Sequence, residues 1–394
     1  MDRNKLEPYA GREQASVKHF LLKSYLERLI MITAPARFDR IAYVDAFAGP
    51  WKSAREDLSD TSFARAVDVM ESCRREIAKK FDRSVSFRAL FVERNADRYA
   101  RLREFTQRRT TEDVQLEAVN ADFAESVSSV ADWIRRDEMA FVLVDPTGWK
   151  DIIAPATLAP LLRRHNVEML INVMWNFINL ATGHPNQEQN LRNIFGDEFE
   201  TLVQAGSGGR GQAWMSAYLR RLRAASGDAA KASRLRTAWF PVEFSAKDRV
   251  FYYLTYVTHH VKGMIVFLEE SARASKYQQE VKFVVRQKRR ETETRMSDIF
   301  GDDLGASADS GSLADDEDAR SLWLELLPTV GAEIRIVEDH MADMAEKCGC
   351  LISHLQTTLR RLIDDGLLQN VDARRARPTN VVDFKQGERI RRVK

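Results

Sequence analysis

The chain has 394 residues, and its 60 lysines and arginines nearly balance its 58 aspartates and glutamates. This balance excludes nucleic-acid binding driven by the charge of the whole chain, so any such signal must be local. The polar start of the sequence lacks the apolar segment of a signal peptide, and no apolar stretch reaches the ~20 residues that span a membrane. These features predict a soluble, cytoplasmic protein with room for more than one domain.

The three cysteines are too few and too irregularly spaced for a disulfide framework or a zinc site. They are Cys73, Cys348 and Cys350. Such usage favours a reducing compartment. We interpret Cys348 and Cys350 as two neutral helix cysteines, although the pair is also able to bind a metal.

Helical segments alternate with buried strands from residue 15 to residue 178. The expected helices are 15–34, 60–81, 96–109, 124–136 and 155–165, with Asp60, Thr61 or Ser62 as the cap of the second. The expected strands, each written with its exit, are 40–49, 86–95, 114–123, 139–149 and 167–178. This alternation predicts an α/β fold with a doubly wound, Rossmann-like parallel sheet.

The regular alternation of helices and strands does not continue in the second half of the chain. Residues 180–238 read as a polar, largely helical insertion. Residues 249–260 and 263–270 are either two strands that close the sheet or a strand and a helix, because periodicity does not separate these alternatives. The acidic stretch at 299–319 has almost nothing to bury and is expected to be a linker.

Residues 320–394 are predicted to form a separate domain, which leaves residues 1–298 to the Rossmann-like one. The expected helices of this domain are 321–330, 338–348 and 351–366, followed by a β-wing at 367–384. Three helices and a wing are the pattern of a winged helix.

Four acids stand where successive strands of the predicted sheet end: Asp45, Glu93, Asp122 and Asp145. In an open parallel sheet, ligands bind beyond the carboxyl ends of the strands, so these acids are expected to converge on one crevice. Glu93 is placed to bind two ribose hydroxyls. Asp122 is placed to accept a hydrogen bond from an adenine amino group, with Phe123 against the ring.

Small residues follow the first acid in the sequence YVDAFAGPW, at 43–51. They are expected to let the backbone approach a ligand closely. No G-x-G-x-x-G or P-loop pattern is present, and Pro50 removes an amide donor, so phosphate binding is not predicted. A nucleoside with a positive charge, S-adenosylmethionine (SAM), suits these residues best. The predicted cofactor contacts here are Asp45, Ala46, Phe47, Ala48, Gly49, Pro50, Glu93, Arg94, Ala121, Asp122 and Phe123.

The segments YVDAFAGPW, FVERN, NADF and VLVDPTGW, in this order, resemble the motifs of class I SAM-dependent methyltransferases. More specifically, residues ~15–275 are similar to the three-Cys-motif partner family. This resemblance implies SAM as cofactor and a protein partner encoded nearby. The three cysteines of the family name belong to that partner and not to this chain. The chain departs from the family pattern at Gly49-Pro50-Trp51, which lacks a second glycine.

The fourth motif resembles the [DNS]-P-P-[YFW] motif of amino-methylating enzymes. In that motif an acid and prolyl carbonyls hold an exocyclic amine while an aromatic ring stacks on the base. Asp145, Pro146 and Trp149 are the predicted catalytic residues, but the second proline is absent and Trp149 comes one residue late. Methylation of an exocyclic amine, methylation of another acceptor and a SAM-binding fold without transfer all remain open.

The segment ASVKHFLLKSYL resembles the helix that precedes the first motif in adenine-N6 methyltransferases of ribosomal RNA. That resemblance implies that Lys18 pairs with the methionine carboxylate of SAM; an exposed helix lysine is the alternative. No metal site is predicted.

Basic residues gather in the C-terminal domain, and the polar side of its third helix suits a nucleic-acid groove. The predicted nucleic-acid contacts are His354, Gln356, Thr357, Arg360, Arg361, Arg374 and Arg375. Winged helices also serve as dimer or protein-docking modules. The leading hypothesis is a SAM-dependent methyltransferase of DNA or RNA. The alternative is a non-catalytic SAM- or nucleotide-binding module joined to a nucleic-acid-binding winged helix, which acts as regulator or partner subunit of a defence or mobile-element system.

Overall fold

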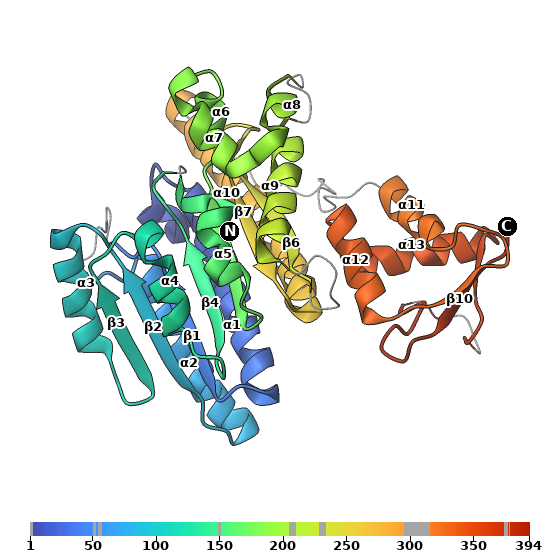
Figure 1. Ribbon diagram of the computed structural model, residues 1–394, viewed down its shortest axis with the longest axis horizontal. Helices are drawn as coiled ribbons and strands as arrows, with labels where there is room; N and C mark the ends of the chain where they lie inside the picture. The colour runs from blue at the N-terminus through green and yellow to red at the C-terminus, as the bar shows by residue number, and fades with distance from the viewer. Residues whose placement is uncertain are drawn as a thin grey trace. The chain divides into compact units, whose positions relative to one another are not determined.

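The structure, a computed structural model, describes residues 3–49, 53, 57–148, 151–204, 210–227, 234–294, 316–373, 377 and 379–394. Contacts between Cα atoms divide the chain into two compact units. The first is Met1–His259 with Ala274–Ala306, and the second is His260–Arg273 with Ser307–Lys394. Figure 1 labels their elements along the chain. The domain boundaries at 298 and 299 lie outside the described residues and stay predictions.

The first unit is built on a seven-stranded sheet with the order β3-β2-β1-β4-β5-β7-β6. Its strands are β1 (Arg40–Asp45), β2 (Ser86–Val92), β3 (Val114–Val119), β4 (Met139–Val144), β5 (Val167–Val173), β6 (Arg236–Glu243) and β7 (Val250–Thr258). Strands β1 to β5 are parallel, whereas β7 is antiparallel to both β5 and β6. The predicted α/β, Rossmann-like sheet is therefore confirmed.

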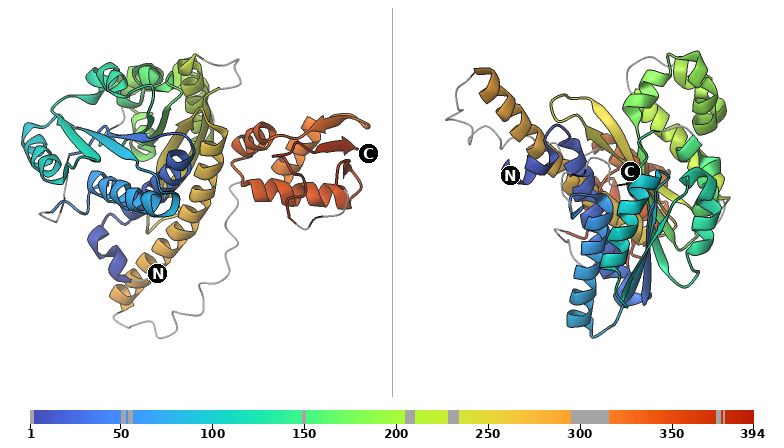
Figure 2. Two further views of the ribbon diagram at one scale, coloured as in Figure 1. Left: turned by 90° about the horizontal axis from the view of Figure 1, so that it is seen from below. Right: turned by 90° about the vertical axis from the view of Figure 1, so that its left-hand side faces the viewer.

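Helices cover both faces of this sheet. They are α1 (Gln14–Ala36), α2 (Ser62–Phe81), α3 (Ala96–Arg109), α4 (Phe123–Trp133), α5 (Pro155–Leu162), α6 (Trp175–Ala181), α7 (Glu188–Phe195), α8 (Phe199–Gln204), α9 (Arg210–Ser226) and α10 (Val261–Thr294). Helices α1 and α2 pack together on one face, while α4, α5 and α9 follow one another on the other face (Figure 2). Because both faces are covered, every residue of β4 and β5 is buried. No helix among the described residues is long and apolar enough to cross a bilayer.

Two sequence expectations change at the end of the sheet, and one open alternative is resolved. The fifth strand stops at Val173, and α6 begins at Trp175, inside the range expected to be extended. Strand β6 begins at Arg236, within the insertion expected at 180–238. Its Pro241 is tolerated because β6 is an edge strand. The two segments at 249–260 and 263–270 are a strand and a helix, since β7 is followed by α10.

Besides the first part of α10, the second unit contains three short helices and a three-stranded antiparallel sheet with the order β8-β10-β9. Its elements are α11 (Asp316–Leu326), β8 (Glu333–Arg335), α12 (Glu338–Cys348), α13 (Ile352–Asp364), β9 (Leu368–Asn370) and β10 (Arg389–Arg392). The expected wing at 367–384 is wrong in its bounds, because β9 pairs with β10, which lies beyond that range. Strand β8 was not expected.

The acidic linker ends earlier than its sequence predicts. Helix α11 begins at Asp316, so residues 316–319 are helical rather than linker. Three acids fill its first turn, where a negative charge is stabilised by the amide ends of the helix. Trp323 then anchors α11 in the second unit, because its ring is fully buried and its indole N–H donates to the Leu355 carbonyl at 3.0 Å.

Candidate functional site

A pocket of about 280 Å³ lies at the carboxyl ends of β1, β4 and β5. Strand order reverses between β1 and β4, which is where open α/β sheets bind ligands. Phe47 and Gly49 reach the pocket from the turn after β1, and Asp145, Pro146 and Thr147 reach it from the end of β4. The pocket therefore joins one predicted cofactor segment to the predicted catalytic segment.

Asp145 is held by two side chains in the wall of this pocket. The Lys18 ammonium forms an ion pair with its Oδ2 atom, and the amide Nδ2 of Asn172 donates to its Oδ1 atom at 2.7 Å. The side chains of Lys18 and Asp145 are only 14% and 17% exposed, so this pair is poorly screened by water. The site thus contains a partly buried carboxylate whose charge is balanced within the pocket.

Helix α1 owes its position to a buried carboxylate on the sheet. The Tyr25 hydroxyl donates to Glu168 Oε2 at 2.6 Å, and the Thr258 hydroxyl donates to Glu168 Oε1 at 2.9 Å. Tyr25 lies seven residues after Lys18 and therefore on the same side of α1. Anchoring Tyr25 to β5 directs Lys18 toward the strand ends.

Asp45 is not part of the pocket surface, although it was predicted to contact the cofactor. Its side chain is fully buried and accepts hydrogen bonds from the Ser62 hydroxyl at 2.8 Å and from the Phe47 amide at 3.1 Å. Its carboxylate holds the turn after β1 against the first residue of α2, whose N-cap is Thr61. Asp45 is thus a structural support of the site.

Burial raises the pKa of Asp45 to about 6. The hydrogen bonds from Ser62 and Phe47 lower this pKa, the charge of Asp145 raises it, and Lys18 lowers it. The folded pKa lies above the unfolded value of 3.8, so the folded state binds the extra proton between these values. Stability from this group is present below pH 4 and is lost as the pH rises through 6.

We expect Asp45→Asn to remove this pH dependence. The loss in the wild type between pH 4 and pH 7 amounts to about 3 kcal/mol, because each pKa unit corresponds to about 1.4 kcal/mol. The measurement is denaturant unfolding across this range, with Asp132→Asn, an exposed acid on α4, as the matched control. Equal pH dependence in the two variants would show that Asp45 titrates normally.

Gly49 allows the turn after β1 to pass over Glu93. A Cβ atom at Gly49 would lie 1.7 Å from Glu93 Oε2, which no real contact permits. Glu93 is 7% exposed, and its Oε1 atom accepts from the Asn95 amide at 2.7 Å. The small residues Ala46 and Ala48 are buried, and their amides donate to Leu143 and Val92. Small side chains here serve close packing of the protein itself, and their close approach to a ligand stays a prediction.

The contacts predicted after β2 and β3 form a neighbouring group. Asp122 caps α4 by accepting from the Ala124 amide at 2.9 Å, and it lies 3.6 Å from the Arg94 guanidinium. Ala121 lies in the turn just before it. Phe123 is 1% exposed and packs edge-on against Phe47 at 5.6 Å, so its ring is in the core and not open to stack on a base. Glu93, Arg94, Ala121 and Asp122 do not line the pocket at Asp145. Pro50 and Trp149 lie outside the described residues.

Sequence reasoning missed several residues of the pocket. Asn172 is the most informative, because a lone amide inside the apolar run VEMLINV is itself a signal. Other missed lining residues are Arg12, Asp60, Ser62, Phe251 and Tyr252. Trp175, which follows β5, packs against Trp214 and Tyr253 and is not a pocket residue.

The predicted nucleic-acid face of α13 is partly wrong. Gln356 is 6% exposed and exchanges two hydrogen bonds with Val382: its Nε2 donates to the carbonyl at 2.9 Å and its Oε1 accepts from the amide at 3.0 Å. Its side chain therefore faces inward. Thr357 is exposed and its hydroxyl donates to the Ser353 carbonyl at 3.0 Å. Arg360 is half-buried.

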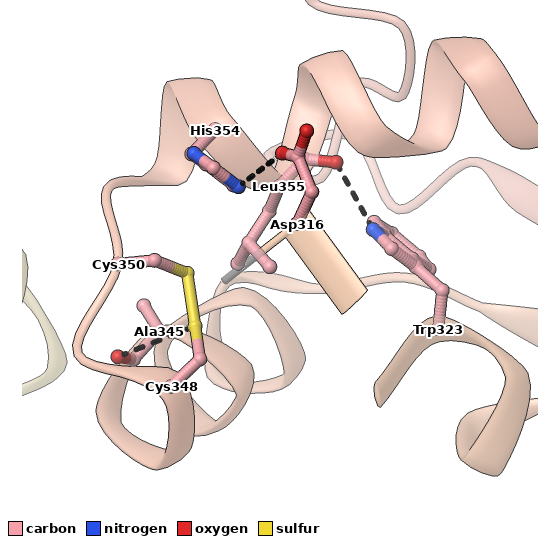
Figure 3. The surroundings of a disulfide bond; sticks show 7 residues. All are labelled: Asp316, Trp323, Ala345, Cys348, Cys350, His354 and Leu355. Atoms are coloured by element: carbon pink, nitrogen blue, oxygen red, sulfur yellow. Dashed lines mark hydrogen bonds and ion pairs between the residues drawn. A yellow bond between two sulfur atoms is a disulfide. The ribbon is translucent and has the colours of Figure 1, made fainter. Parts of the chain in front are cut away.

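Asp316 engages two of the predicted nucleic-acid contacts. Its Oδ1 atom lies 3.1 Å from His354 Nε2 (Figure 3). Its Oδ2 atom lies 2.5 Å from the Arg361 guanidinium. A phosphate would have to compete with this acid for both side chains. Arg374 and Arg375 lie outside the described residues.

The structure joins Cys348 to Cys350 in a disulfide at the end of α12 (Figure 3). This corrects the expectation of two neutral cysteines. Gly349 between them adopts φ 65°, a left-handed conformation that ends α12 and brings the two Cα atoms within 5.3 Å. Cys73 is a free, buried cysteine, and burial raises the pKa of its thiol to about 12. Among the described residues, no group of three or more histidines, cysteines or acids is arranged to hold a metal ion.

No family model and no curated protein matches the chain. Solved structures do match, among them the protein LPL1258 of Legionella pneumophila, which is described with the family model DUF519. The identity is 10% and the TM-score is 0.33, over 62% of this chain and 84% of that one. A likeness this weak carries no argument about function.

Proposed function

We propose that the protein is a SAM-dependent methyltransferase that acts on an exocyclic amine of a nucleic-acid base. The observation that carries this proposal is Asp145, a partly buried carboxylate at the switch point of a Rossmann-like sheet, held by Lys18 and Asn172. The resemblance of four strand exits to the class I methyltransferase motifs supplies the cofactor. The resemblance to the three-Cys-motif partner family also supports a protein partner encoded nearby.

The residues present suit such a cofactor and acceptor. SAM supplies an electrophilic methyl group on a positively charged sulfur. Glu93 and Asp122 would hold its nucleoside, and Lys18 would hold its carboxylate. Asp145 accepts a hydrogen bond from the acceptor amine, and its negative charge stabilises the positive charge that develops on that nitrogen. A weakly acidic amine needs positioning more than a strong base.

The second unit supports a role in presenting nucleic acid. Its element order, with β8 before α12 and a β9–β10 pair after α13, is in keeping with a winged helix. Asp316 pairs with His354 and Arg361. We therefore expect the second unit to bind nucleic acid with modest affinity that depends strongly on salt concentration.

One observation favours the non-catalytic alternative. Asp145 is already paired with Lys18, and Thr147 replaces the second proline of the amino-methylating motif. A SAM-binding regulator or partner subunit would retain the cofactor site while Asp145 stays paired with Lys18 and does not bind an acceptor.

The test combines a binding and a transfer measurement on the full chain. We expect calorimetry to show SAM binding, with no comparable binding of ATP or NAD, and we expect transfer of tritiated methyl groups to DNA or RNA. Absence of SAM binding would overturn the cofactor assignment. SAM binding without transfer to any nucleic acid would favour the regulator or partner subunit.

A further inference from the structure

The turn that joins β6 to β7, residues 244–249, lies at the same end of the sheet as the pocket. Strand β7 is antiparallel to β5 and pairs Tyr253 with Val173, the last residue of β5. The start of β7 therefore lies beside the carboxyl end of β5, which is where the pocket is found. Phe251, the second residue of β7, is itself a lining residue. The hairpin turn thus borders the candidate site.

An arginine of this hairpin turn is held over an aromatic ring. The Arg249 guanidinium lies 4.9 Å from the centre of the Phe244 ring, and its Nη2 atom donates to Asn176 Oδ1 at 2.8 Å. The Phe244 ring in turn contacts Phe251, with 4.6 Å between the ring centres. Arg249 is exposed, whereas Phe244 and Phe251 are half-buried. A series of contacts therefore runs from the pocket residue Phe251 through Phe244 to an exposed guanidinium.

Two cations of the hairpin turn have no acidic partner. Lys247 and Arg249 are exposed, and no acid among the described residues forms an ion pair with either of them. The acids of the turn and of the end of β6 are paired with cations of α10: Glu243 and Asp248 with Lys282, and Asp248 also with Arg286. A third acid, Glu13, accepts a hydrogen bond from the Ser245 hydroxyl at 3.3 Å. The turn therefore presents two unpaired cations beside two aromatic rings.

We propose that Arg249 stacks on a base of an unpaired nucleic-acid strand, next to the base that enters the pocket, and that Lys247 contacts the phosphate backbone of that strand. This inference rests on the proposed function, because it names the form of nucleic acid that the same pocket accepts. A base must leave the double helix before its amino group can reach a pocket, and its neighbours then lose a stacking partner. Aromatic rings and arginine guanidinium planes take that place in proteins that bind single strands.

The composition of the hairpin turn favours a single strand over a duplex. A duplex offers its phosphates to a protein and keeps its bases stacked, so the ring behind Arg249 would add nothing to binding. A guanidinium backed by Phe244 suits the flat face of a base, and Lys247 suits a phosphate. An unpaired strand offers both groups at once.

The experiment measures the binding of fluorescently labelled oligonucleotides to the full chain by anisotropy, over a range of salt concentrations. The probes are RNA and DNA strands of mixed sequence and about 12 nucleotides, a length that single-strand sites cover, and the duplexes of the same sequences. We expect the wild type to bind at least one single strand about tenfold more tightly than its duplex. Absence of binding, or equal or tighter binding of both duplexes, overturns the inference.

Arg249→Lys separates stacking from charge, because it keeps the positive charge and loses the flat guanidinium. It should weaken single-strand binding by about tenfold and leave the salt dependence unchanged. Lys247→Ala should instead lower the slope of log affinity against log salt concentration by about 0.7, the value for one phosphate contact on a single strand. Both side chains are exposed, so neither substitution removes core packing.

Arg37→Lys and Lys79→Ala are the matched controls, at the opposite end of the sheet. Arg37 follows α1, and its guanidinium lies 5.3 Å from the centre of the Phe38 ring. Lys79 lies in the last turn of α2. Both helices end shortly before the next strand begins, away from the carboxyl ends of the strands. Neither control should change single-strand binding.

Three results on the variants would contradict the inference. Single-strand binding by Arg249→Lys that equals wild-type binding overturns the stacking role of Arg249. An equal loss in Arg37→Lys shows that the effect is not specific to the hairpin turn and overturns that role as well. An unchanged salt slope in Lys247→Ala removes the phosphate contact.

These outcomes are separate from those of the proposed function. Methyl transfer that Arg249→Lys leaves unchanged, in a protein that prefers duplexes, would sink the role of the hairpin turn and leave the enzyme assignment standing. Single-strand binding that depends on Arg249, in a protein that transfers no methyl group, would sink the enzyme assignment and leave this surface standing.

Discussion

Asp145→Asn should reduce methyl transfer to nucleic acid by about 100-fold or more, the size of effect seen when a group that stabilises transition-state charge is removed. The substitution keeps the shape of the side chain and one oxygen. It removes the negative charge that offsets the positive charge developing on the acceptor nitrogen, and it replaces one acceptor by a donor. The loss therefore falls on the transition state more than on the bound ground state.

The binding of SAM to this variant should not weaken. Lys18 forms an ion pair with Asp145 in the structure, so the substitution frees the ammonium for the carboxylate of the cofactor. The measurements are tritiated-methyl transfer at saturating SAM and calorimetry of SAM binding, with Asp132→Asn as the surface control. Unchanged transfer would remove Asp145 from catalysis. An unchanged rate of methyl transfer at saturating SAM, together with greatly weakened SAM binding, would instead place Asp145 in the cofactor site.

Glu93→Ala should weaken SAM binding by about tenfold or more, because loss of a hydrogen bond to a charged, largely buried group costs about 1.5–3 kcal/mol. Gly49→Ala should act in the same direction without removing any polar group. Its new Cβ atom would lie 1.7 Å from Glu93 Oε2, so the Glu93 carboxylate must move. Two substitutions, one after β1 and one after β2, are thus expected to disturb one contact.

Gly148→Ala is the matched control for the glycine substitution. It lies in the turn after β4, and a Cβ atom there would meet no atom within 4 Å. Calorimetry of SAM binding at one salt concentration compares the three variants with the wild type. Equal affinity for the wild type and Glu93→Ala would refute the assignment of Glu93 to the cofactor. A loss in Gly148→Ala equal to that in Gly49→Ala would show that the effect is not specific to the β1 turn.

The main sheet was accessible to sequence reasoning because its signals are local. Strands β1, β4 and β5 are nearly continuous apolar runs, as expected of parallel strands covered on both faces. Strand β6 was not predicted, because Pro241 breaks its pattern. Its assignment to the sheet depends on pairing with β7. Such pairing is a property of the folded edge and leaves little trace in the segment itself.

Side-chain direction was the least predictable part of the site. Gln356 reads as a polar residue on the outer side of α13, yet it is bound to the backbone of Val382, 26 residues later. Phe123 reads as an aromatic at a strand exit, yet it packs into the core against Phe47. In both cases a partner that is distant along the chain decides where the side chain lies.

The sequence by itself determined the α/β class, the order of its first five strands along the chain and the acids that end four of them. Periodicity and strand-exit residues are short-range properties, so they can be read without coordinates. Tertiary structure decided which of these acids act together: it buried Asp45 under Ser62, set Glu93 against Gly49 and joined Asp145 to Lys18, 127 residues away, and to Asn172. The physical reason is that burial, pKa and hydrogen-bond pairing depend on neighbours brought together by the fold, and no local pattern specifies them.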